Sequence, residues 1–418
     1  MKLEVIGQNE LEGEIRISGA KNSALPAMAA SLLTDEILLK NIPIVEDIKS
    51  MTLLIKGLGG EITIDEKNNL IRLNNKKLSS LEAPYEYVKK MRASILVLGP
   101  LLTRYGEVRV AYPGGCKIGA RPVDLHIENL RRMGAEIRVE HGTIIAKVKR
   151  RLKGTRLNFE KVSVTGTENI LMAAVLAEGE TVIENAAKEP EVTDLANLLI
   201  KMGAKIEGAG TDIIKVKGVK KLHPVEYSII PDRIETGTYL IIGSLIAKNL
   251  RISNVIPEHV RSIILKLNEA GVFPKEGSDY YMVRRSEKIN PVDIETQPFP
   301  GFPTDMQAQF MVLLTQAEGR SIIRDTIFPG RFHHVDELLR LGANIKKLGN
   351  GEVSVMGKTE LSGAEVLATD LRASASLVIA ALIANGKTII HDIYHLERGY
   401  EKLAEKLKKV GGNINKTE

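Results

Sequence analysis

The sequence predicts an α/β fold built from six copies of a β-α-β-α-β-β unit. A short signature recurs along the chain, an apolar residue followed by glycine and a strand, as in Met133-Gly134-Ala135-Glu136-Ile137. Its first glycine stands at positions 59, 134, 203, 271, 342 and 411, so the spacing stays between 68 and 75 residues. Near-equal spacing over a whole chain indicates an internal repeat. The units also share one order of apolar and amphipathic segments, and the last unit is incomplete.

The third copy illustrates the elements of the unit. A strand at Leu157–Phe159 precedes a helix at 169–177 that is apolar nearly all round, which predicts burial. A β-branched strand follows at Glu180–Glu184, and then a two-faced helix that ends at the signature glycine. Glycine is favoured just after a helix because it adopts a positive φ without strain. The sixth copy repeats the pattern with a strand at 366–368, a helix at 374–384 and a strand at 387–392.

A β-hairpin completes each unit, as in residues 135–149 with a turn at His141-Gly142. The sixth copy stops after Ile414-Asn415 and lacks its second hairpin strand, whereas residues 2–6 at the start form a strand without a neighbour. The simplest closure pairs the two ends of the chain, so residues 1–20 belong with the C-terminal half.

The amino-acid composition limits the classes of function that this protein can have. The chain has 418 residues, 44% apolar and 26% charged, which is typical of a globular protein with a large core. No apolar run reaches the length of a membrane span, and the N-terminus lacks the apolar core of a signal peptide. With one cysteine the chain has no internal disulfide, and we expect a cytoplasmic protein. No pattern of metal ligands is present, so neither a metal nor another cofactor is expected.

The net charge of +6 raises the question of an anionic partner. The charges are interleaved and only 4% of residues are aromatic, so a nucleic-acid partner is disfavoured. A small anionic substrate held by a few converging cations fits at least as well.

The only cysteine, Cys116, lies in a loop with three glycines and two prolines, Pro113-Gly114-Gly115-Cys116-Lys117-Ile118-Gly119-Ala120-Arg121-Pro122. Lys117 and Arg121 place positive charge near the thiol, and positive charge favours the thiolate. A buried structural cysteine is the alternative, but such cysteines usually lie in apolar helices or strands. We therefore expect a functional thiol.

Polar side chains recur where the first strand of each unit meets its buried helix. Asp, Ser and Thr at these junctions act as N-caps, and we expect this of Ser163, Thr304 and Thr369. A cation at a helix N-terminus is unfavourable unless an anion offsets it. Four junctions nevertheless carry one, which indicates either anion binding or an ion pair with a carboxylate: Lys21, Arg92, Arg233 and Arg372.

Several of these segments together resemble the UDP-N-acetylglucosamine 1-carboxyvinyltransferases, a family of enolpyruvyl transferases. The resemblance covers essentially the whole chain and rests on residues 17–22, 113–126, 231–237, 302–310, 368–375 and 398–400. The Pro-Gly-Gly-Cys loop with Ala-Arg-Pro-Val-Asp-Leu-His is its most specific part. It also separates this family from the related shikimate-pathway transferase.

The resemblance implies a two-domain inside-out α/β barrel with three repeats in each domain, residues 21–230 and residues 1–20 plus 231–418. It implies transfer of enolpyruvyl from phosphoenolpyruvate to the 3′-hydroxyl of UDP-N-acetylglucosamine, the first committed step of peptidoglycan synthesis. Lys21, Arg121 and Arg398 would hold phosphoenolpyruvate, and Asp305 would take the hydroxyl proton. Cys116 would donate a proton or assist product release, and would be the target of fosfomycin.

The resemblance also implies the remaining substrate contacts. They are Asn22, Arg92, Arg121, Pro122, Val123, Asp124, Leu125, Lys161, Ser163, Val164, Asp305 and Ile327 around the nucleotide sugar, and Arg331, Asp370 and Arg372 elsewhere in the site. Two alternatives stay open, a shikimate-3-phosphate enolpyruvyl transferase and a non-catalytic paralogue that only binds a nucleotide sugar. The sequence leaves the oligomeric state undetermined.

Overall fold

The computed structural model describes residues 1–114 and 123–417, which form two compact units. One unit contains residues 19–114 and 123–230, and the other contains residues 1–18 and 231–417. Each unit has its own hydrophobic core, one built from residues between Ala20 and Ile229 and one from residues 3–17 and 234–414. We describe the units one at a time.

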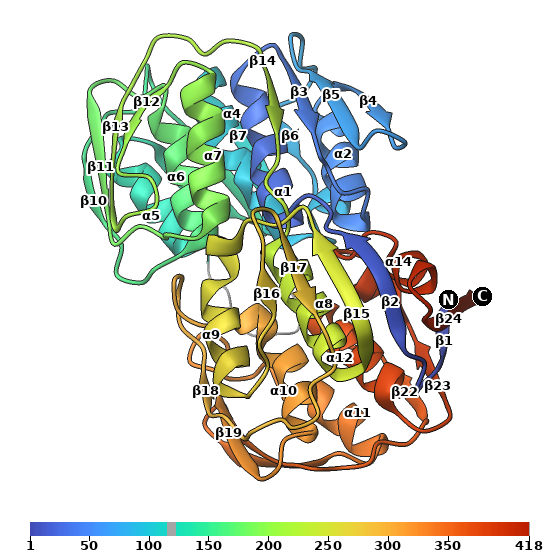
Figure 1. Ribbon diagram of the computed structural model, residues 1–418. Coiled ribbons are helices and arrows are strands. Elements are labelled where there is room, and N and C mark those ends of the chain that lie inside the picture. The colour runs from blue at the N-terminus through green and yellow to red at the C-terminus, as the bar shows by residue number, and fades with distance from the viewer. Residues whose placement is uncertain (115–122, 418) are drawn as a thin grey trace. The chain divides into compact units, whose positions relative to one another are not determined.

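The unit of residues 19–230 contains three four-stranded sheets (Figure 1). Their strand orders are β14 (Val225–Ser228), β3 (Glu36–Lys40), β5 (Leu70–Asn74), β4 (Glu61–Asp65); β6 (Glu82–Ala83), β7 (Glu107–Ala111), β9 (Thr143–Lys147), β8 (Glu136–Glu140); and β10 (Arg156–Asn158), β11 (Glu180–Glu184), β13 (Ile213–Lys217), β12 (Lys205–Glu207). The helical segments are α1 (Lys21–Ala30), η1 (Ser31–Leu33), α2 (Glu46–Gly57), α3 (Tyr85–Val88), η2 (Arg92–Val97), α4 (Leu98–Tyr105), α5 (Asp124–Arg132), α6 (Val164–Ala174) and α7 (Pro190–Lys201).

The unit of residues 1–18 and 231–417 repeats this arrangement. Its sheets are β22 (Glu365–Leu367), β23 (Lys387–His391), β1 (Lys2–Ile6), β24 (Asn413–Thr417); β16 (Lys275–Glu276), β17 (Tyr280–Val283), β15 (Ala247–Ser253), β2 (Leu11–Arg16); and β18 (Ile294–Glu295), β19 (Arg320–Arg324), β21 (Glu352–Met356), β20 (Asn344–Gly349). The helical segments are α8 (Arg233–Ile246), η3 (Pro257–Val260), α9 (Arg261–Glu269), η4 (Thr304–Met306), α10 (Gln307–Thr315), α11 (His334–Arg340), α12 (Leu371–Ile383), α13 (Tyr394–Glu397) and α14 (Leu403–Lys409).

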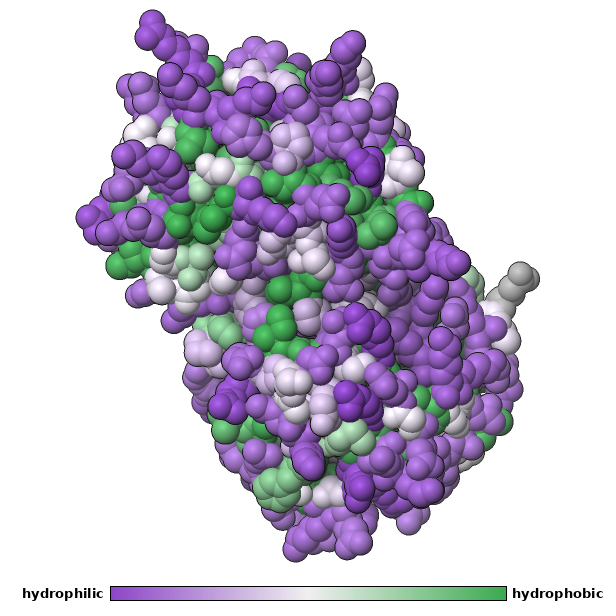
Figure 2. Space-filling view, turned by 45° about the horizontal axis from the view of Figure 1, so that its top comes forward, coloured by the Kyte–Doolittle hydropathy of each residue, from purple (hydrophilic) through white to green (hydrophobic). Residues whose placement is uncertain are grey.

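The first helix of each repeat is buried, as its apolar composition predicts. In α12 nearly every residue from Arg372 to Leu382 is buried, and α1, α6, α8 and α10 are similar. The second helices, such as α2 and α5, bury only one face. In each unit, sheets lie outside the buried helices (Figure 1), which is the predicted inside-out arrangement. The face seen in Figure 2 is mostly hydrophilic, with scattered hydrophobic groups.

The signature glycines have the conformation that their position after a helix requires. All six have a positive φ, from +80° at Gly271 to +103° at Gly203 and Gly411. The hairpin predicted over 135–149 is confirmed as β8 and β9, with positive φ at His141 and Gly142 in the turn. The predicted helices begin too late, because α6 starts at Val164 and α12 at Leu371. The first turns of these helices are polar, because the N-terminus of a buried helix needs partners for its free N–H groups. They therefore lack the apolar pattern from which the helices were predicted.

The two ends of the chain pair, as predicted. Strand β1 lies between β23 and β24 and is antiparallel to both, with Lys2 opposite His391 on one side and Thr417 on the other. Strand β2 pairs in parallel with β15, and β14 pairs in parallel with β3. Each of these two strands therefore joins the sheet of a repeat distant from it in sequence. No helix formed by the described residues is long and apolar enough to span a membrane.

Candidate functional site

In the unit of residues 1–18 and 231–417, one carboxylate is held between two guanidinium groups. Asp305 Oδ1 accepts a hydrogen bond from Arg331 Nη1 at 2.6 Å, and Asp305 Oδ2 accepts one from Arg372 Nη2 at 2.9 Å. Both arginines are buried, with 6% and 4% of their surface exposed. The three residues come from η4, the segment before α11 and the start of α12, so the fold assembles the cluster from distant parts of the sequence.

Local structure explains these positions. Asp370 Oδ1 caps α12 by accepting hydrogen bonds from the backbone N–H groups of Arg372 and Ala373. The backbone of Arg372 is thereby fixed in the first turn of a buried helix, with Asp305 as the anion that offsets its charge. The ion-pair alternative left open by the sequence is the arrangement observed for Arg372.

Charge and burial act in opposite directions on Asp305. Burial alone would raise the pKa of the carboxyl, but Arg372 and Arg331 outweigh burial and hold that pKa well below its ordinary value. Asp305 is therefore ionised at neutral pH. The Nε atoms of Arg331 and Arg372 are buried and lack a hydrogen-bond partner among the described residues. Each guanidinium thus has donor capacity left for an anion.

A hydrogen-bond network joins Arg372 to helices α8 and α10. The hydroxyl of Tyr400 lies 3.4 Å from Arg372 Nη1, 2.8 Å from Thr238 Oγ1 and 3.3 Å from Gln309 Nε2. Gln309 Nε2 also donates to the backbone oxygen of Asp305 at 2.9 Å. This network orients both members of the Arg372–Asp305 pair, and no pattern in the sequence predicts its geometry.

Asp325 is a further residue that sequence reasoning missed. It is 1% exposed and accepts hydrogen bonds from Thr304 Oγ1 at 2.6 Å and from the backbone N–H of Ile327 at 3.0 Å. It thereby connects the segment of Ile327 to the residue preceding Asp305. A polar residue directly after a buried strand, here β19, was the available signal.

Two of the three predicted N-caps are wrong. Ser163 caps α6, because its Oγ accepts from the backbone N–H of Gly166 at 3.1 Å. Thr304 instead donates its hydroxyl hydrogen to Asp325, and the cap of α12 is Asp370 rather than Thr369. Thr369 does not cap α12 because the carboxylate of Asp370 is the stronger acceptor. The Thr304 hydroxyl is instead engaged by Asp325 and by Arg331 Nη1, which lies 3.3 Å from its oxygen.

The other unit contains a second group of predicted site residues. Lys21, the first residue of α1, pairs with Asp47 of α2 at 3.0 Å, and both side chains are at least nine-tenths buried. An ion pair thus offsets this helix-terminal cation too. Asn22 follows it and is partly exposed. Asp47, in the first turn of the second helix, was not predicted.

Arg92 begins η2 and is half-buried. Burial lowers the pKa of its guanidinium, and the proximity of Tyr112 opposes that change. Val123 and Leu125 flank Asp124 at the start of α5, and the start of α6 lies against them. A Cβ atom on Gly166 would stand 2.5 Å from Leu125 Cδ2, so a larger residue there would displace the Leu125 side chain.

The placement of the remaining predicted residues is as follows. Lys161 is exposed, Val164 begins α6, and Arg398 lies half-buried directly after α13. Cys116, Arg121 and Pro122 lie outside the described residues. Asp305, Ile327, Arg331, Asp370, Arg372 and Arg398 therefore belong to one unit, and Lys21, Asn22, Arg92, Val123, Asp124, Leu125, Lys161, Ser163 and Val164 to the other.

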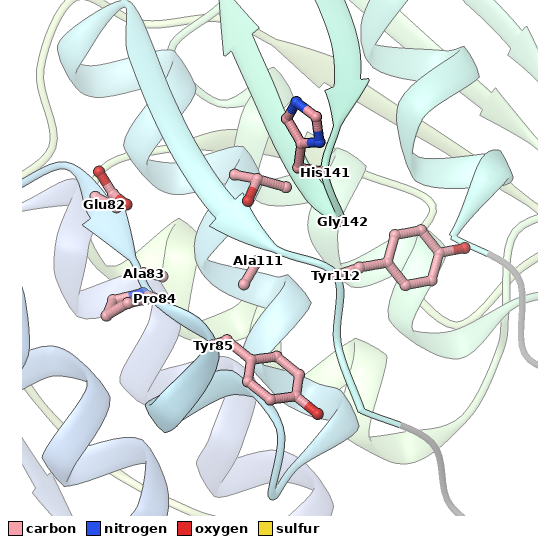
Figure 3. A pocket seen from close by; sticks show the side chains of 9 residues that line it. Glu82, Ala83, Pro84, Tyr85, Ala111, Tyr112, His141 and Gly142 are labelled. Atoms are coloured by element: carbon pink, nitrogen blue, oxygen red, sulfur yellow. The ribbon is translucent and has the colours of Figure 1, made fainter.

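A pocket of about 320 Å³ lies beside the segment that leads to residue 114 (Figure 3). Tyr85 and Tyr112 extend their rings at its edge, and His141 stands at the hairpin turn on another side. None of the predicted site residues lines this pocket. The described residues also contain no group of three or more His, Cys, Asp or Glu side chains that could hold a metal ion.

The fold and site define an α/β protein with a buried Asp305 between Arg331 and Arg372, and comparison with known proteins shows its family. Residues 5–407 match the family model described as EPSP synthase (3-phosphoshikimate 1-carboxyvinyltransferase). The chain belongs to this family. The enolpyruvyl transferase NikO from Streptomyces tendae has a similar structure, with a TM-score of 0.89, 26% sequence identity and coverage of 99% of this chain and 98% of that one. An EPSP synthase from Acinetobacter baumannii shares the fold, with a TM-score of 0.76 at 17% identity and full coverage of both chains.

Two similar sequences share one name. A UDP-N-acetylglucosamine 1-carboxyvinyltransferase from Koribacter versatilis is 54% identical over 99% of this chain and 96% of its own length. The protein of the same name from Thermodesulfovibrio yellowstonii is also 54% identical, over 99% of both chains. The resemblance recognised in the sequence, and the fold that it implied, are confirmed.

Proposed function

We propose that this protein transfers the enolpyruvyl group of phosphoenolpyruvate to the 3′-hydroxyl of UDP-N-acetylglucosamine and releases phosphate. The observation that carries the proposal is the ionised Asp305 held between two buried arginines with spare donors. The 54% identity to transferases named for this reaction supports it. We also propose, as the resemblance in the sequence implies, a place at the first committed step of peptidoglycan synthesis, in the cytoplasm.

The reaction requires both a base and an acid. In the addition step the sugar oxygen bonds to the central carbon of phosphoenolpyruvate, the hydroxyl proton goes to a base, and the methylene carbon gains a proton. In the elimination step the carbon–oxygen bond to phosphate breaks and the new methyl group loses a proton, which restores the double bond. A positioned acid or base contributes about 10²–10⁴-fold each.

Asp305 is the proposed base, and its arginine partners control its basicity. With both oxygens paired, the carboxylate has a low affinity for a proton. An anionic substrate that accepts hydrogen bonds from Arg331 and Arg372 competes for their charge, which raises the pKa of Asp305 toward the value that a base needs. Substrate binding would therefore activate the base.

The other roles follow the family by position. Lys21, Arg121 and Arg398 would bind the phosphate and carboxylate of phosphoenolpyruvate, and Asn22 would contact the intermediate or the sugar. Cys116 would act as proton donor or in product release, and both roles stay open. The proposed domains are residues 21–230 and residues 1–20 plus 231–418, and each contains some of the proposed substrate residues. The scheme uses no metal and no cofactor.

The alternative acceptor is shikimate 3-phosphate, because the matching family model is described by that reaction. A phosphate-release assay with phosphoenolpyruvate and either acceptor separates the two. We expect release with UDP-N-acetylglucosamine and none above background with shikimate 3-phosphate. Release with shikimate 3-phosphate alone would reverse the assignment, and nucleotide-sugar binding without release would indicate a non-catalytic paralogue.

A further inference from the structure

A second, strongly basic pocket lies in the unit of residues 19–230. It has a volume of about 380 Å³ and is formed where η1, α4 and α6 end, by residues 33–35, 103–106, 150–151, 176 and 220–222. The predicted substrate residues Lys21 and Val164 stand at the other ends of α1 and α6. Twelve residues of helix separate Lys21 from Leu33, a distance of about 18 Å, so this pocket is distinct from the predicted site.

Two of its five cationic side chains stabilise helix ends. Arg104 donates to the backbone oxygens of Leu32 and Thr34 and pairs with Asp35 at 2.6 Å. Arg151 donates to the backbone oxygens of Leu176 and Val219, both at 2.7 Å. These contacts neutralise the negative C-terminal ends of the buried helices.

The other three cations do not stabilise helix ends. Arg150, Lys220 and Lys221 are exposed, and their side chains make no ion pair or hydrogen bond within the described part of the chain. Asp35 is the only carboxylate among the residues that line the pocket, and Arg104 already pairs with it. The pocket therefore keeps a surplus of positive charge, which attracts anions.

Two hydroxyl groups at the same pocket lack partners. Thr34 is 3% exposed, and its Oγ1 has no hydrogen-bond partner among the described residues; the same holds for the hydroxyl of Tyr105. Burial raises the pKa of Tyr105, so its phenol stays protonated and can donate. Both oxygens are buried in the free protein, so a ligand in the pocket reaches them only after a change of side-chain rotamer. Such a change would give a partner to a hydroxyl whose unpaired burial destabilises the fold.

We propose that this pocket binds a small oligophosphate, a di- or triphosphate group, through Arg150, Lys220 and Lys221 with help from the Thr34 and Tyr105 hydroxyls. Lysine and arginine are the side chains that most often bind phosphate oxygens. A volume of about 380 Å³ exceeds what one phosphate needs and lies in the range of small-ligand sites. Three cations supplied by two separate segments match a ligand with several charges.

The first experiment compares two charge variants by calorimetric titration with inorganic pyrophosphate. The test variant is Arg150→Gln/Lys220→Gln/Lys221→Gln. The matched control is Lys205→Gln/Lys215→Gln/Lys217→Gln, which removes equal charge from exposed positions of the same unit. We expect saturable binding to the unmodified protein, at least tenfold weaker binding to the test variant and unchanged binding to the control.

Three results would overturn the proposal: no saturable binding, equal weakening in both variants, or a single binding event that survives in the test variant. The last result would place pyrophosphate at the predicted substrate site instead. A parallel titration with ATP distinguishes the free oligophosphate from a nucleotide. Tighter binding of ATP, lost in the same test variant, would identify a nucleoside triphosphate as the ligand.

Thr34→Val separates ligand binding from stability. The substitution removes an unpaired hydroxyl at nearly constant volume, so we expect an unchanged or higher melting temperature together with at least threefold weaker pyrophosphate binding. A purely structural role of Thr34 would leave the affinity unchanged, and that outcome would remove the hydroxyl from the proposed site and overturn this part of it.

Discussion

At the scale of single residues, Asp305 combines two demands that oppose each other. Its charge keeps Arg331 and Arg372 compensated inside the protein, whereas a base must be able to accept a proton. In the free protein the Asp305 carboxylate therefore stabilises the fold as a counter-charge, and in the proposed reaction the same carboxylate acts as the base. Replacing it tests both functions at once.

We predict that Asp305→Asn abolishes turnover and destabilises its unit by about 3 kcal/mol, because two buried guanidiniums lose their counter-charge. Phosphate release measures the first effect and urea unfolding the second. Asp336→Asn is the control, since Asp336 pairs with Lys347 at an exposed site and its loss costs about 0–1 kcal/mol. Near-normal turnover in folded Asp305→Asn protein would remove Asp305 from the role of base.

At the scale of elements, one buried amide joins its own helix to three other helical segments. Asn169 of α6 donates from Nδ2 to the Ile95 backbone oxygen in η2 and to His126 Nδ1 of α5, and its Oδ1 accepts from the Gly99 N–H in α4. Because the amide donates to Nδ1, His126 is neutral with its proton on Nε2. This contact orients the start of α5, where Val123, Asp124 and Leu125 lie.

His126 makes this unit sensitive to acid. Burial, with a further effect of Arg92, lowers the pKa of His126 to about 4 from 6.5. The unfolded chain therefore binds the proton more tightly, and stability falls as the pH drops from 6.5 toward 4, by up to about 3 kcal/mol. The urea concentration at the midpoint of unfolding should fall between pH 7 and pH 4.5. This concentration should depend less on pH in His126→Gln. His141→Gln, at an exposed turn, should retain the full dependence.

Gly99 sets the distance between α4 and α6. A Cβ atom at this position would lie 2.4 Å from Asn169 Oδ1 and 2.5 Å from the Asn169 backbone oxygen. We predict that Gly99→Ala destabilises the protein by about 2 kcal/mol, because overpacking of up to about 3 kcal/mol exceeds the gain of about 1 kcal/mol in helix propensity. Thermal unfolding measures the effect. Gly330→Ala, where a Cβ meets no atom within 4 Å, should leave the melting temperature nearly unchanged.

The periodic part of this architecture was predictable, and the polar connections were not. Glycine spacing and apolar helices predicted six repeats, the positive φ at Gly59 or Gly411 and the pairing of the chain ends. The sequence also indicated that Lys21 and Arg372 need an anion. It could not identify Asp47 and Asp305 as those anions, because partners 26 and 67 residues away are set by packing rather than by any local pattern.

At the scale of the whole molecule, the unit with the C-terminus depends on the first residues of the chain. Leu3 and Val5 of β1 are 1% and 0% exposed, and β1 is the only contact between β23 and β24 in its sheet. Strand β2 likewise completes the sheet of β15.

We predict that deletion of residues 1–16 unfolds the unit of residues 231–417 while the unit of residues 19–230 keeps its structure. Hydrogen exchange resolved by segment measures this, with loss of protection confined to the former. A circular permutant that reattaches residues 1–16 after residue 418 through a flexible linker is the control. It should restore protection, because Lys2 and Thr417 are paired neighbours. Loss of protection in both units would show that they fold as one.

The central position of β1 also has a consequence for biosynthesis. A ribosome releases β1 long before its neighbours β23 and β24, which include residues 387–391 and 413–417. At about 5–20 residues per second, the nascent N-terminal strand waits about 20–80 s for a partner, while residues 19–230 emerge in full. A strand with an apolar face that remains unpaired for so long can pair with the wrong strand. Strand β1 thus reaches its place in the sheet long after its own synthesis, and a chaperone near the ribosomal exit would have that time to protect it.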